Sequence, residues 1–324
     1  MPLNQSHRFC IAPMIDWTDR YCRFFHRLLT RKARLYTEMV VDEAIIRGDR
    51  DRLLDPGSVA GPVALQLGGS DAGRLAEAAR IGEGYGYQEV NFNVGCPSDR
   101  VQSGAFGACL MRDPSLVARG VEAMRRAVSV PVTVKCRIGV DDQDPAAVLP
   151  AFADAMAGAG CETLIVHARK AWLQGLSPKE NRSVPPLDYE LVAQLARERR
   201  DLHVVLNGGI GSLDEAEAHL GRFAGVMLGR AAYERPYLLT SVDERLFGEN
   251  VPAPSRAMVV RTVADRAERT GTPVWRYARH MLGLYAGEPG ARTWRRRLSE
   301  ETRAGGSPVL LDALDEVEAA QAAA

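Results

Sequence analysis

Two glycine turns in the second half of the chain could hold a phosphate group. Asn207-Gly208-Gly209-Ile210 comes shortly before Ser212, and Gly229-Arg230 follows further on. Glycine lets the backbone approach an anion closely, and the N-terminus of a helix beginning after Ser212 would favour negative charge. The guanidinium of Arg230 adds a positive charge. The pair of turns predicts a phosphate site, and two tight turns without a ligand are the alternative.

Lys135 lies within the apolar run 132–137. A lysine in a buried strand is costly unless it meets an anion. A cation beside the pyrimidine end of a flavin would stabilise the negative charge of the reduced ring, which is how proteins tune this cofactor. We therefore expect a flavin beside Lys135; a side chain that extends to the strand end and into water is the alternative.

Cys96 lies in the turn Gly95-Cys96-Pro97, which would present its thiol as a proton donor or nucleophile. By residue type alone a lone cysteine is more often a small apolar core residue. We expect that role for the cysteines at positions 10, 109, 136 and 161. The six cysteines form no CxxC pair and no metal spacing, so we expect reduced thiols and no metal site.

His167 is followed closely by two further basic residues, Arg169 and Lys170. This grouping indicates a contact with phosphate or RNA. A histidine with a purely structural role is the alternative.

Eight short apolar runs, rich in β-branched residues and separated by helical stretches, must position these side chains. The runs are residues 9–12, 33–37, 62–67, 89–93, 132–137, 163–167, 203–207 and 225–228. Such alternation indicates parallel strands joined by helices, and eight units predict a (β/α)₈ TIM barrel in the α/β class. A doubly wound Rossmann sheet is the alternative, but no GxGxxG motif follows the first run.

The helices between the strands have recognisable first residues. Ser70, Asp113, Asp144 and Ser212 each precede an amphipathic stretch, and two of them are followed by proline. The chemically suggestive residues above all come at the carboxyl ends of predicted strands, the end at which such barrels carry their active sites.

The pattern becomes purely helical toward the C-terminus. We predict a barrel domain over residues 1–240 and a helical domain over residues 241–324, with Pro252 and Pro254 marking the boundary. Gly305-Gly306 should break the helices, and the alanine-rich tail should be frayed. Residues 255–303 hold eleven arginines against five acidic residues, which favours a nucleic-acid partner; a solvated charged face is the alternative.

The chain has neither an apolar leader near its first residues nor a run of about 20 apolar residues that could span a membrane. We therefore expect a cytoplasmic protein without membrane contact.

Taken together, these segments closely resemble the tRNA-dihydrouridine synthases, in particular the DusA type. The segments that carry the resemblance are Ala12-Pro13-Met14, Tyr36-Thr37-Glu38-Met39, Ala64-Leu65-Gln66-Leu67-Gly68-Gly69, residues 91–100, 106–111, 134–139, 167–181, 185–189 and 207–210, Gly290-Ala291-Arg292 and Trp294-Arg295-Arg296. The resemblance implies an FMN enzyme that takes hydride from NADPH. It also implies reduction of uridine to 5,6-dihydrouridine at positions 20 and 20a of the tRNA D-loop.

The resemblance also assigns roles to individual residues. The residues implied to bind FMN are Pro13, Met14, Gln66, Lys135, His167, Asn207, Gly208, Gly209, Gly229 and Arg230. Cys96 becomes the general acid, which protonates uracil C5 while flavin N5 gives hydride to C6 from the opposite face. The implied tRNA contacts are Asn93, Lys179, Arg182, Arg296 and Ser299.

The chain departs from the expected pattern after Met39, where Val40-Val41-Asp42-Glu43 replaces small hydroxyl residues. Two carboxylates near the barrel mouth would change the local substrate contacts. Two other functions remain open: a small-molecule FMN reductase of the dihydroorotate or dihydropyrimidine dehydrogenase kind, and a non-catalytic RNA-binding protein.

Overall fold

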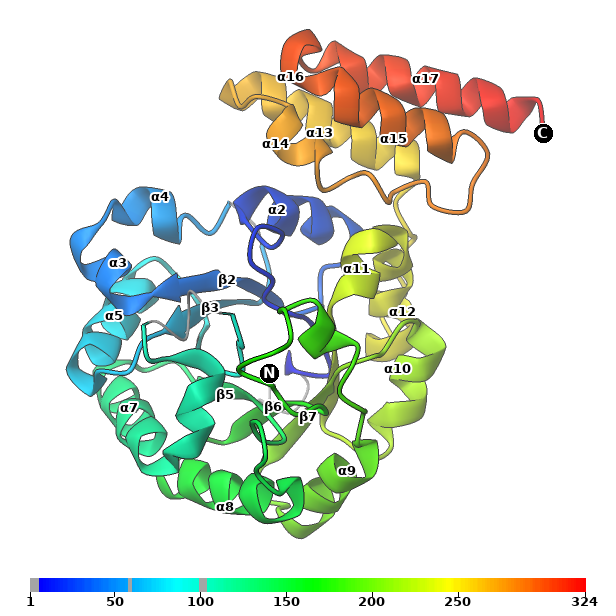
Figure 1. The fold of residues 1–324 in the computed structure, drawn as a ribbon. Helices are drawn as coiled ribbons and strands as arrows, with labels where there is room; N and C mark the ends of the chain where they lie inside the picture. The colour runs from blue at the N-terminus through cyan, green and yellow to red at the C-terminus, as the bar shows by residue number, and fades with distance from the viewer. Residues whose placement is uncertain (1–5, 58–59, 99–103) are drawn as a thin grey trace. The chain divides into compact units, whose positions relative to one another are not determined.

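The computed structural model describes residues 6–57, 60–98 and 104–324. Eight parallel strands form one sheet in the order β1-β8-β7-β6-β5-β4-β3-β2. The strands are β1 (Phe9–Ile11), β2 (Leu35–Val41), β3 (Val63–Gly68), β4 (Glu89–Val94), β5 (Val132–Arg137), β6 (Thr163–His167), β7 (His203–Asn207) and β8 (Gly225–Leu228). The sheet closes on itself because the Ile11 amide donates to the Arg34 carbonyl at 2.9 Å and the Arg34 amide donates to the Phe9 carbonyl at 3.0 Å. The predicted (β/α)₈ barrel is confirmed, and Figure 1 shows its ring of helices around the strands.

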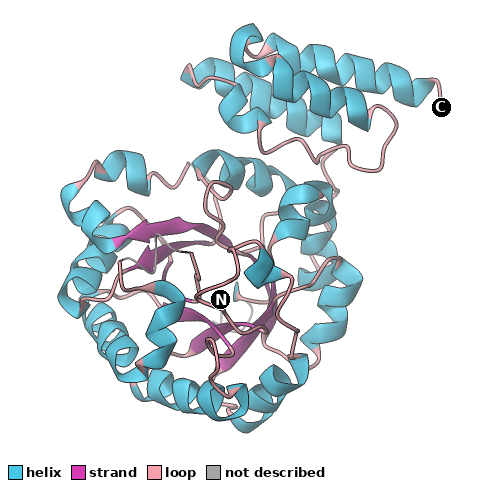
Figure 2. Ribbon diagram, in the orientation of Figure 1, coloured by secondary structure: helices cyan, strands magenta, loops and turns pink. Residues whose placement is uncertain are grey.

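Helices cover the outside of the barrel, as Figure 2 shows. They are α3 (Asp42–Arg47), α4 (Arg50–Leu54), α5 (Ala72–Gly84), α7 (Pro114–Ala127), α8 (Pro145–Gly158), α9 (Tyr189–Glu198) and α10 (Leu213–Leu220), with the 3-10 turns η1 (Gly107–Arg112) and η2 (Glu180–Arg182). Asp113, Asp144 and Ser212 cap their helices as predicted. The prediction for Ser70 is wrong, because Asp71 is the N-cap and accepts the Arg74 amide at 2.8 Å.

The second strand differs from its prediction of residues 33–37. It runs from Leu35 to Val41 and pairs with β3 as far as the Val41–Gly68 pair, after a register shift between Tyr36 and Met39. The apolar run ends at Thr37 and Glu38, but backbone pairing with β3 continues past these polar residues. Hydrogen bonding along the strand, rather than side-chain polarity, therefore decides where β2 ends.

Contacts group the chain into two compact units. One comprises residues 1–15, 33–56 and 62–229, and the other comprises residues 16–32, 57–61 and 230–324. The second unit contains α2 (Arg20–Leu29), α11 (Arg230–Glu234), η3 (Pro236–Ser241), α12 (Val242–Phe247), α13 (Arg256–Thr270), α14 (Trp275–Ala278), α15 (Ala291–Glu300), α16 (Thr302–Gly305) and α17 (Pro308–Ala322). The division after residue 240 stays a prediction.

The C-terminal segment forms a helix that packs against its neighbours. Helix α17 continues to Ala322, with Val309, Leu310, Leu314 and Val317 buried. It contacts α13 and α15. An apolar stripe at helical spacing can be buried only if the helix is formed, so packing against two neighbouring helices stabilises α17 as far as Val317, and fraying of the exposed alanine-rich end stays a prediction.

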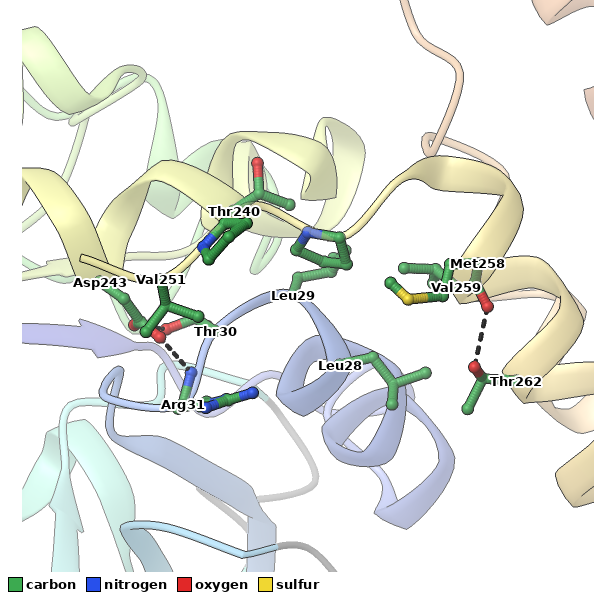
Figure 3. A pocket seen from close by; sticks show the side chains of 12 residues that line it. Leu28, Leu29, Thr30, Arg31, Thr240, Asp243, Val251, Met258, Val259 and Thr262 are labelled. Atoms are coloured by element: carbon green, nitrogen blue, oxygen red, sulfur yellow. Dashed lines mark hydrogen bonds between the residues drawn. The ribbon is translucent and has the colours of Figure 1, made fainter. Parts of the chain in front are cut away.

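A crevice of about 210 Å³ lies within the second unit, between the end of α2, α12 and the start of α13 (Figure 3). Its buried carboxylate, Asp243, accepts hydrogen bonds from the Thr30 hydroxyl at 2.5 Å and from the backbone amides of Arg31 and Lys32 at 2.7 and 3.1 Å. Asp243 therefore joins α12 to the residues that end α2. None of the predicted site residues lines this crevice.

In the part of the chain that the structure describes, no helix combines the length and the apolar character that crossing a bilayer requires.

Candidate active site

Strand pairing brings the predicted site residues of the barrel to one end. Asn93 is paired with Lys135, and His167 is paired with Asn207. Gln66 is paired with Asn91 one layer deeper. Because all eight strands are parallel, their carboxyl ends meet on the same face of the barrel, and these side chains form one cluster there.

Lys135 is half-buried and has no acidic partner among the described residues. Its Nζ donates a hydrogen bond of 3.1 Å to Asn207 Oδ1, and Asn207 Nδ2 donates to the Met227 carbonyl at 2.8 Å. No carboxylate within the described residues forms an ion pair with Lys135. Burial, aided by the charge of Arg137, lowers the pKa of Lys135 to about 8. A ligand carrying negative charge would relieve this cost, so the lysine fits the flavin that the sequence predicts.

His167 is buried, and its pKa is held well below the ordinary value, first by burial and then by the charges of Arg137, Lys135, Arg169 and Arg182. At neutral pH the ring is therefore uncharged. Neither ring nitrogen forms a hydrogen bond with a residue that the structure describes. His167 can offer a ligand a neutral N–H donor or nitrogen acceptor, while the positive charge comes from its neighbours.

The turn after β7 requires glycine at two successive positions. Gly208 has φ +111° and Gly209 has φ +77°. A Cβ at Gly208 would lie 2.6 Å from His167 Cδ2, and one at Gly209 would lie 2.6 Å from Leu187 Cδ1. The Tyr189 hydroxyl donates to the Gly208 carbonyl at 2.5 Å and holds the turn. The backbone here is both unusual in conformation and closely packed, so both positions require glycine.

At the N-terminus of the helix that follows this turn, side chains of the same segment already accept hydrogen bonds from the backbone amides. Ser212 Oγ accepts the Glu215 amide at 3.2 Å, and the Glu215 carboxylate accepts the Gly211 amide at 2.7 Å. These contacts use amides that the sequence argument offered to an anion. The glycine turns themselves, rather than the N-terminus of α10, are thus the better place for a phosphate.

The turn after β8 lies beside the end of β1. A Cβ at Gly229 would be 3.8 Å from Ala12 Cβ and 3.8 Å from Met14 Sδ. Pro13 and Met14, which follow β1 in the sequence, are half-buried. Arg230 is exposed and begins α11 in the second unit.

Two side chains and one backbone amide hold the Cys96 turn; the amide is that of Ala108, which donates to the Cys96 carbonyl at 2.9 Å. Asn93 Oδ1 accepts the backbone amides of Gly95 at 3.1 Å and Cys96 at 3.0 Å. Arg137 Nε donates to the Gly95 carbonyl at 2.9 Å. The Cys96 thiol is half-buried and its Sγ lies 3.4 Å from Ser98 Oγ, whereas Cys10, Cys22, Cys136 and Cys161 are buried. Asp99 and Arg100, which complete the family motif, lie outside the described residues.

Arg137 is a site residue that the sequence reasoning missed. It is buried, and its guanidinium also donates to the carbonyls of Lys170 at 3.0 Å and Asn181 at 2.9 Å. Burial and neighbouring charges lower its pKa to about 10. Alternation along β5 places Arg137 on the same face as Lys135, and this spacing could have revealed it.

Trp172 is a second residue that the sequence reasoning passed over. Its side chain is 40% exposed, and Lys170 Nζ lies 5.4 Å from its ring centre. Asn181 fixes the backbone of Trp172 by accepting its amide at 2.7 Å and donating to its carbonyl at 2.9 Å. The loop after β6 therefore presents a rigidly anchored aromatic ring to solvent, which is a surface suited to stacking with a nucleobase.

The predicted tRNA contacts fall into two sets in the two units. Lys179 and Arg182 are exposed around η2 in the barrel unit. Arg296 and Ser299 are exposed on α15, whose other face buries Trp294 and Leu298.

The two unexpected carboxylates after β2 have arginine partners. Asp42 is buried, and its Oδ2 lies 3.6 Å from Arg74 Nε. Glu43 is exposed and lies 3.2 Å from Arg47 one turn along α3. Burial raises the pKa of Asp42. Asp42 and Glu43 are therefore engaged with α5 and α3.

No group of three or more histidine, cysteine, aspartate or glutamate side chains among the described residues is arranged to hold a metal ion.

Comparison with known proteins identifies relatives of this chain. Residues 10–324 match the family model described as dihydrouridine synthase (Dus). The chain is 54% identical over 308 residues to a tRNA-dihydrouridine(20/20a) synthase of Salmonella typhimurium, covering 94% of this chain and 92% of the relative. It is 54% identical to that of Escherichia coli K12, covering 95% and 90%, and 51% identical to that of Vibrio parahaemolyticus, covering 97% and 98%. The chain therefore belongs to the dihydrouridine synthase family.

Proposed function

We propose that this protein is a flavin-dependent tRNA-dihydrouridine(20/20a) synthase, which reduces uridine to 5,6-dihydrouridine in the D-loop of tRNA. The observation that carries the proposal is the shared location of two groups. The half-buried Cys96 thiol lies in a turn held by Asn93 and Arg137. Lys135, a half-buried cation without a carboxylate partner among the described residues, is paired with Asn93 from the neighbouring strand. A proton donor and a site for an electron-rich ring therefore occupy the same end of the barrel.

The cofactor proposed for this site is FMN, on which the family depends, with NADPH as the source of electrons. The residues that would hold it are Pro13, Met14, Gln66, Lys135, His167, Asn207, Gly208, Gly209, Gly229 and Arg230. When bound, FMN supplies the hydride. Lys135 contributes positive charge, the neutral ring of His167 contributes a hydrogen bond, and the two glycine turns give the phosphate access to backbone amides.

Cys96 is the proposed general acid, which holds the proton for uracil C5 opposite the hydride donor. Asn93 orients the Cys96 turn and contacts the target nucleotide. A uridine can reach this depth only if it leaves the stack, so the rest of the tRNA must be held by its phosphates. Lys179 and Arg182 on the barrel unit, and Arg296 and Ser299 within residues 241–324, are the proposed contacts. We also propose that the protein acts in the cytoplasm.

The test is to map dihydrouridine in tRNA from cells with and without this gene. We expect dihydrouridine at positions 20 and 20a to disappear on deletion, to return with the intact gene and not to return with Cys96→Ala. In a purified system, the protein with NADPH should reduce a tRNA transcript and leave free uracil unchanged. Turnover of free uracil or dihydroorotate without tRNA binding would instead identify a small-molecule reductase, and a colourless protein that binds tRNA would identify a non-catalytic one.

A further inference from the structure

A continuous chain of hydrogen bonds crosses the barrel interior. It begins at Glu89, at the amino end of β4, whose Oε1 accepts the Thr133 hydroxyl at 2.6 Å. Asn91 Nδ2 donates to Thr133 Oγ1 at 2.8 Å, and Gln66 Nε2 donates to Asn91 Oδ1 at 2.7 Å. Asn93 Nδ2 then donates to Gln66 Oε1 at 2.8 Å. Four hydrogen bonds thus connect a buried carboxylate to the asparagine that holds the Cys96 turn.

Strand geometry explains why these five side chains meet. Glu89, Asn91 and Asn93 alternate along β4 and so point to the same side, into the barrel. Asn91 is paired with Gln66 on β3 and with Thr133 on β5. All five side chains are buried, and none is more than 8% exposed. Water therefore competes little with these hydrogen bonds.

The groups at the two ends of this hydrogen-bond chain decide which partner donates and which accepts in every bond between them. Burial alone would raise the pKa of Glu89, but the charges of His7 and Arg34 outweigh it and lower the pKa to about 2. An ionised carboxylate only accepts, so Thr133 must donate to it and must accept from Asn91. At the other end the amides of Gly95 and Cys96 only donate, so Asn93 must present its oxygen to them. Reversing any amide between these ends would set donor against donor and acceptor against acceptor.

This direction also decides what Asn93 has left for a substrate. Its oxygen already accepts two backbone amides, and one N–H of its amide is donated to Gln66. The second N–H is the remaining hydrogen-bonding group of the side chain. Asn93 is thereby set to donate, as recognition of a uracil carbonyl oxygen requires.

We propose that Glu89 and Thr133 are positioning residues for the reduction, which act through Asn91, Gln66 and Asn93 to hold the Cys96 turn and to keep Asn93 a donor. The catalytic part of this inference rests on the proposed function, whereas the role of the hydrogen bonds in holding the Cys96 turn does not. A thiol and an amide held in one orientation need less ordering in the transition state.

The test uses replacements at Thr133, because its hydroxyl is the link between Glu89 and Asn91. Thr133→Val removes the hydroxyl and keeps the shape, and Thr133→Ser restores it. Tyr36→Phe is the matched control: the Tyr36 hydroxyl donates to the same Glu89 oxygen at 3.0 Å but does not lead to Cys96. If the valine variant does not fold, Thr133→Ala carries the same expectation with more room for its neighbours.

The first measurement is the alkylation rate of Cys96 by iodoacetamide, resolved by mass spectrometry, as a ratio to the rate of N-acetylcysteine in the same solution. We expect Thr133→Val to raise this rate ratio because the Cys96 turn loosens, while Thr133→Ser and Tyr36→Phe keep the wild-type ratio. The second measurement is the single-turnover reoxidation of reduced flavin by tRNA. We expect a loss of about tenfold in Thr133→Val, restoration in Thr133→Ser and no change in flavin reduction by NADPH.

A folded Thr133→Val protein with the wild-type alkylation ratio and reoxidation rate would overturn the proposal, as would an equal effect of Tyr36→Phe. A changed alkylation ratio in a protein that reduces no tRNA would refute the proposed function and leave the role of the chain in holding Cys96 intact. The two failures are therefore distinguishable.

Discussion

Lys135 Nζ donates a hydrogen bond of 3.1 Å to Asn207 Oδ1, so a cation on β5 is tied to the residue that begins the glycine turn after β7. The asparagine is neutral and cannot compensate the charge. The pKa of Lys135 is therefore lowered to about 8, chiefly by burial.

FMN affinity should accordingly depend on pH. Below about pH 8 the lysine is charged in the ligand-free protein, and FMN meets a ready cation. As pH rises above 8 the lysine loses its proton and binding must take one up, so the Kd should rise by at most about tenfold per pH unit. Quenching of FMN fluorescence from pH 7 to pH 9.5 measures this. Lys135→Met is the control: methionine does not titrate, so any dependence of its Kd on pH comes from the flavin itself. Parallel curves of Kd against pH for the two proteins would contradict the prediction.

Gly208→Ala should weaken FMN binding by about tenfold or more and destabilise the fold. The new methyl group would lie 2.6 Å from His167 Cδ2 at a φ of +111°, so both ring and backbone must move. Gly221→Ala is the matched control, because Gly221 has φ −71° and no atom within 4 Å of its Cβ position. That control should bind FMN normally and unfold at the same or a slightly higher temperature. Equal FMN affinities in the two variants would count against a flavin at this turn.

Trp172→Ala should weaken tRNA binding and leave flavin reduction by NADPH unchanged. Stacking of a base on an aromatic ring contributes about 1–3 kcal/mol, which corresponds to a loss in affinity of about fivefold to 150-fold. Trp172→Phe should retain part of the affinity. Val184→Ala tests whether any exposed apolar side chain after β6 matters, since Val184 is 60% exposed. Titration of labelled tRNA by fluorescence anisotropy measures all three, and a wild-type Kd for Trp172→Ala would exclude stacking there.

Asp243→Asn should lower the free energy of unfolding by about 2–3 kcal/mol, because an amide nitrogen would face hydrogen-bond donors of residues 30–32. Urea denaturation followed by circular dichroism measures the change. Glu249→Gln is the control, since the Lys32–Glu249 ion pair is partly exposed and should contribute less than about 1 kcal/mol. If both variants lose less than about 1 kcal/mol of the free energy of unfolding, the hydrogen bonds of Asp243 do not stabilise the contact between α12 and the end of α2.

The barrel and most of its site could be predicted from local sequence. Strands such as Val132–Arg137 matched their predictions residue for residue. In these strands the turn residues on either side of a β-branched run mark where the strand begins and ends. The glycine turns and Lys135 were identifiable because their residue types are unusual at strand ends. Local sequence failed where packing decides: it ended β2 too early, because the pairing that extends this strand comes from β3, a distant segment.

The amino-acid sequence by itself determined the eight-stranded α/β order, the end of the barrel at which the candidate site residues gather and the family to which the chain belongs. Those properties follow from periodicity and from side chains that are costly anywhere else. Only the tertiary structure decided the neutral state of His167, the self-capped start of α10 and the orientation of Asn93, because each depends on charges or donors supplied by other strands. Glu89 and Thr133 are 44 residues apart, and their hydrogen bond exists only because β4 and β5 lie side by side in the closed barrel.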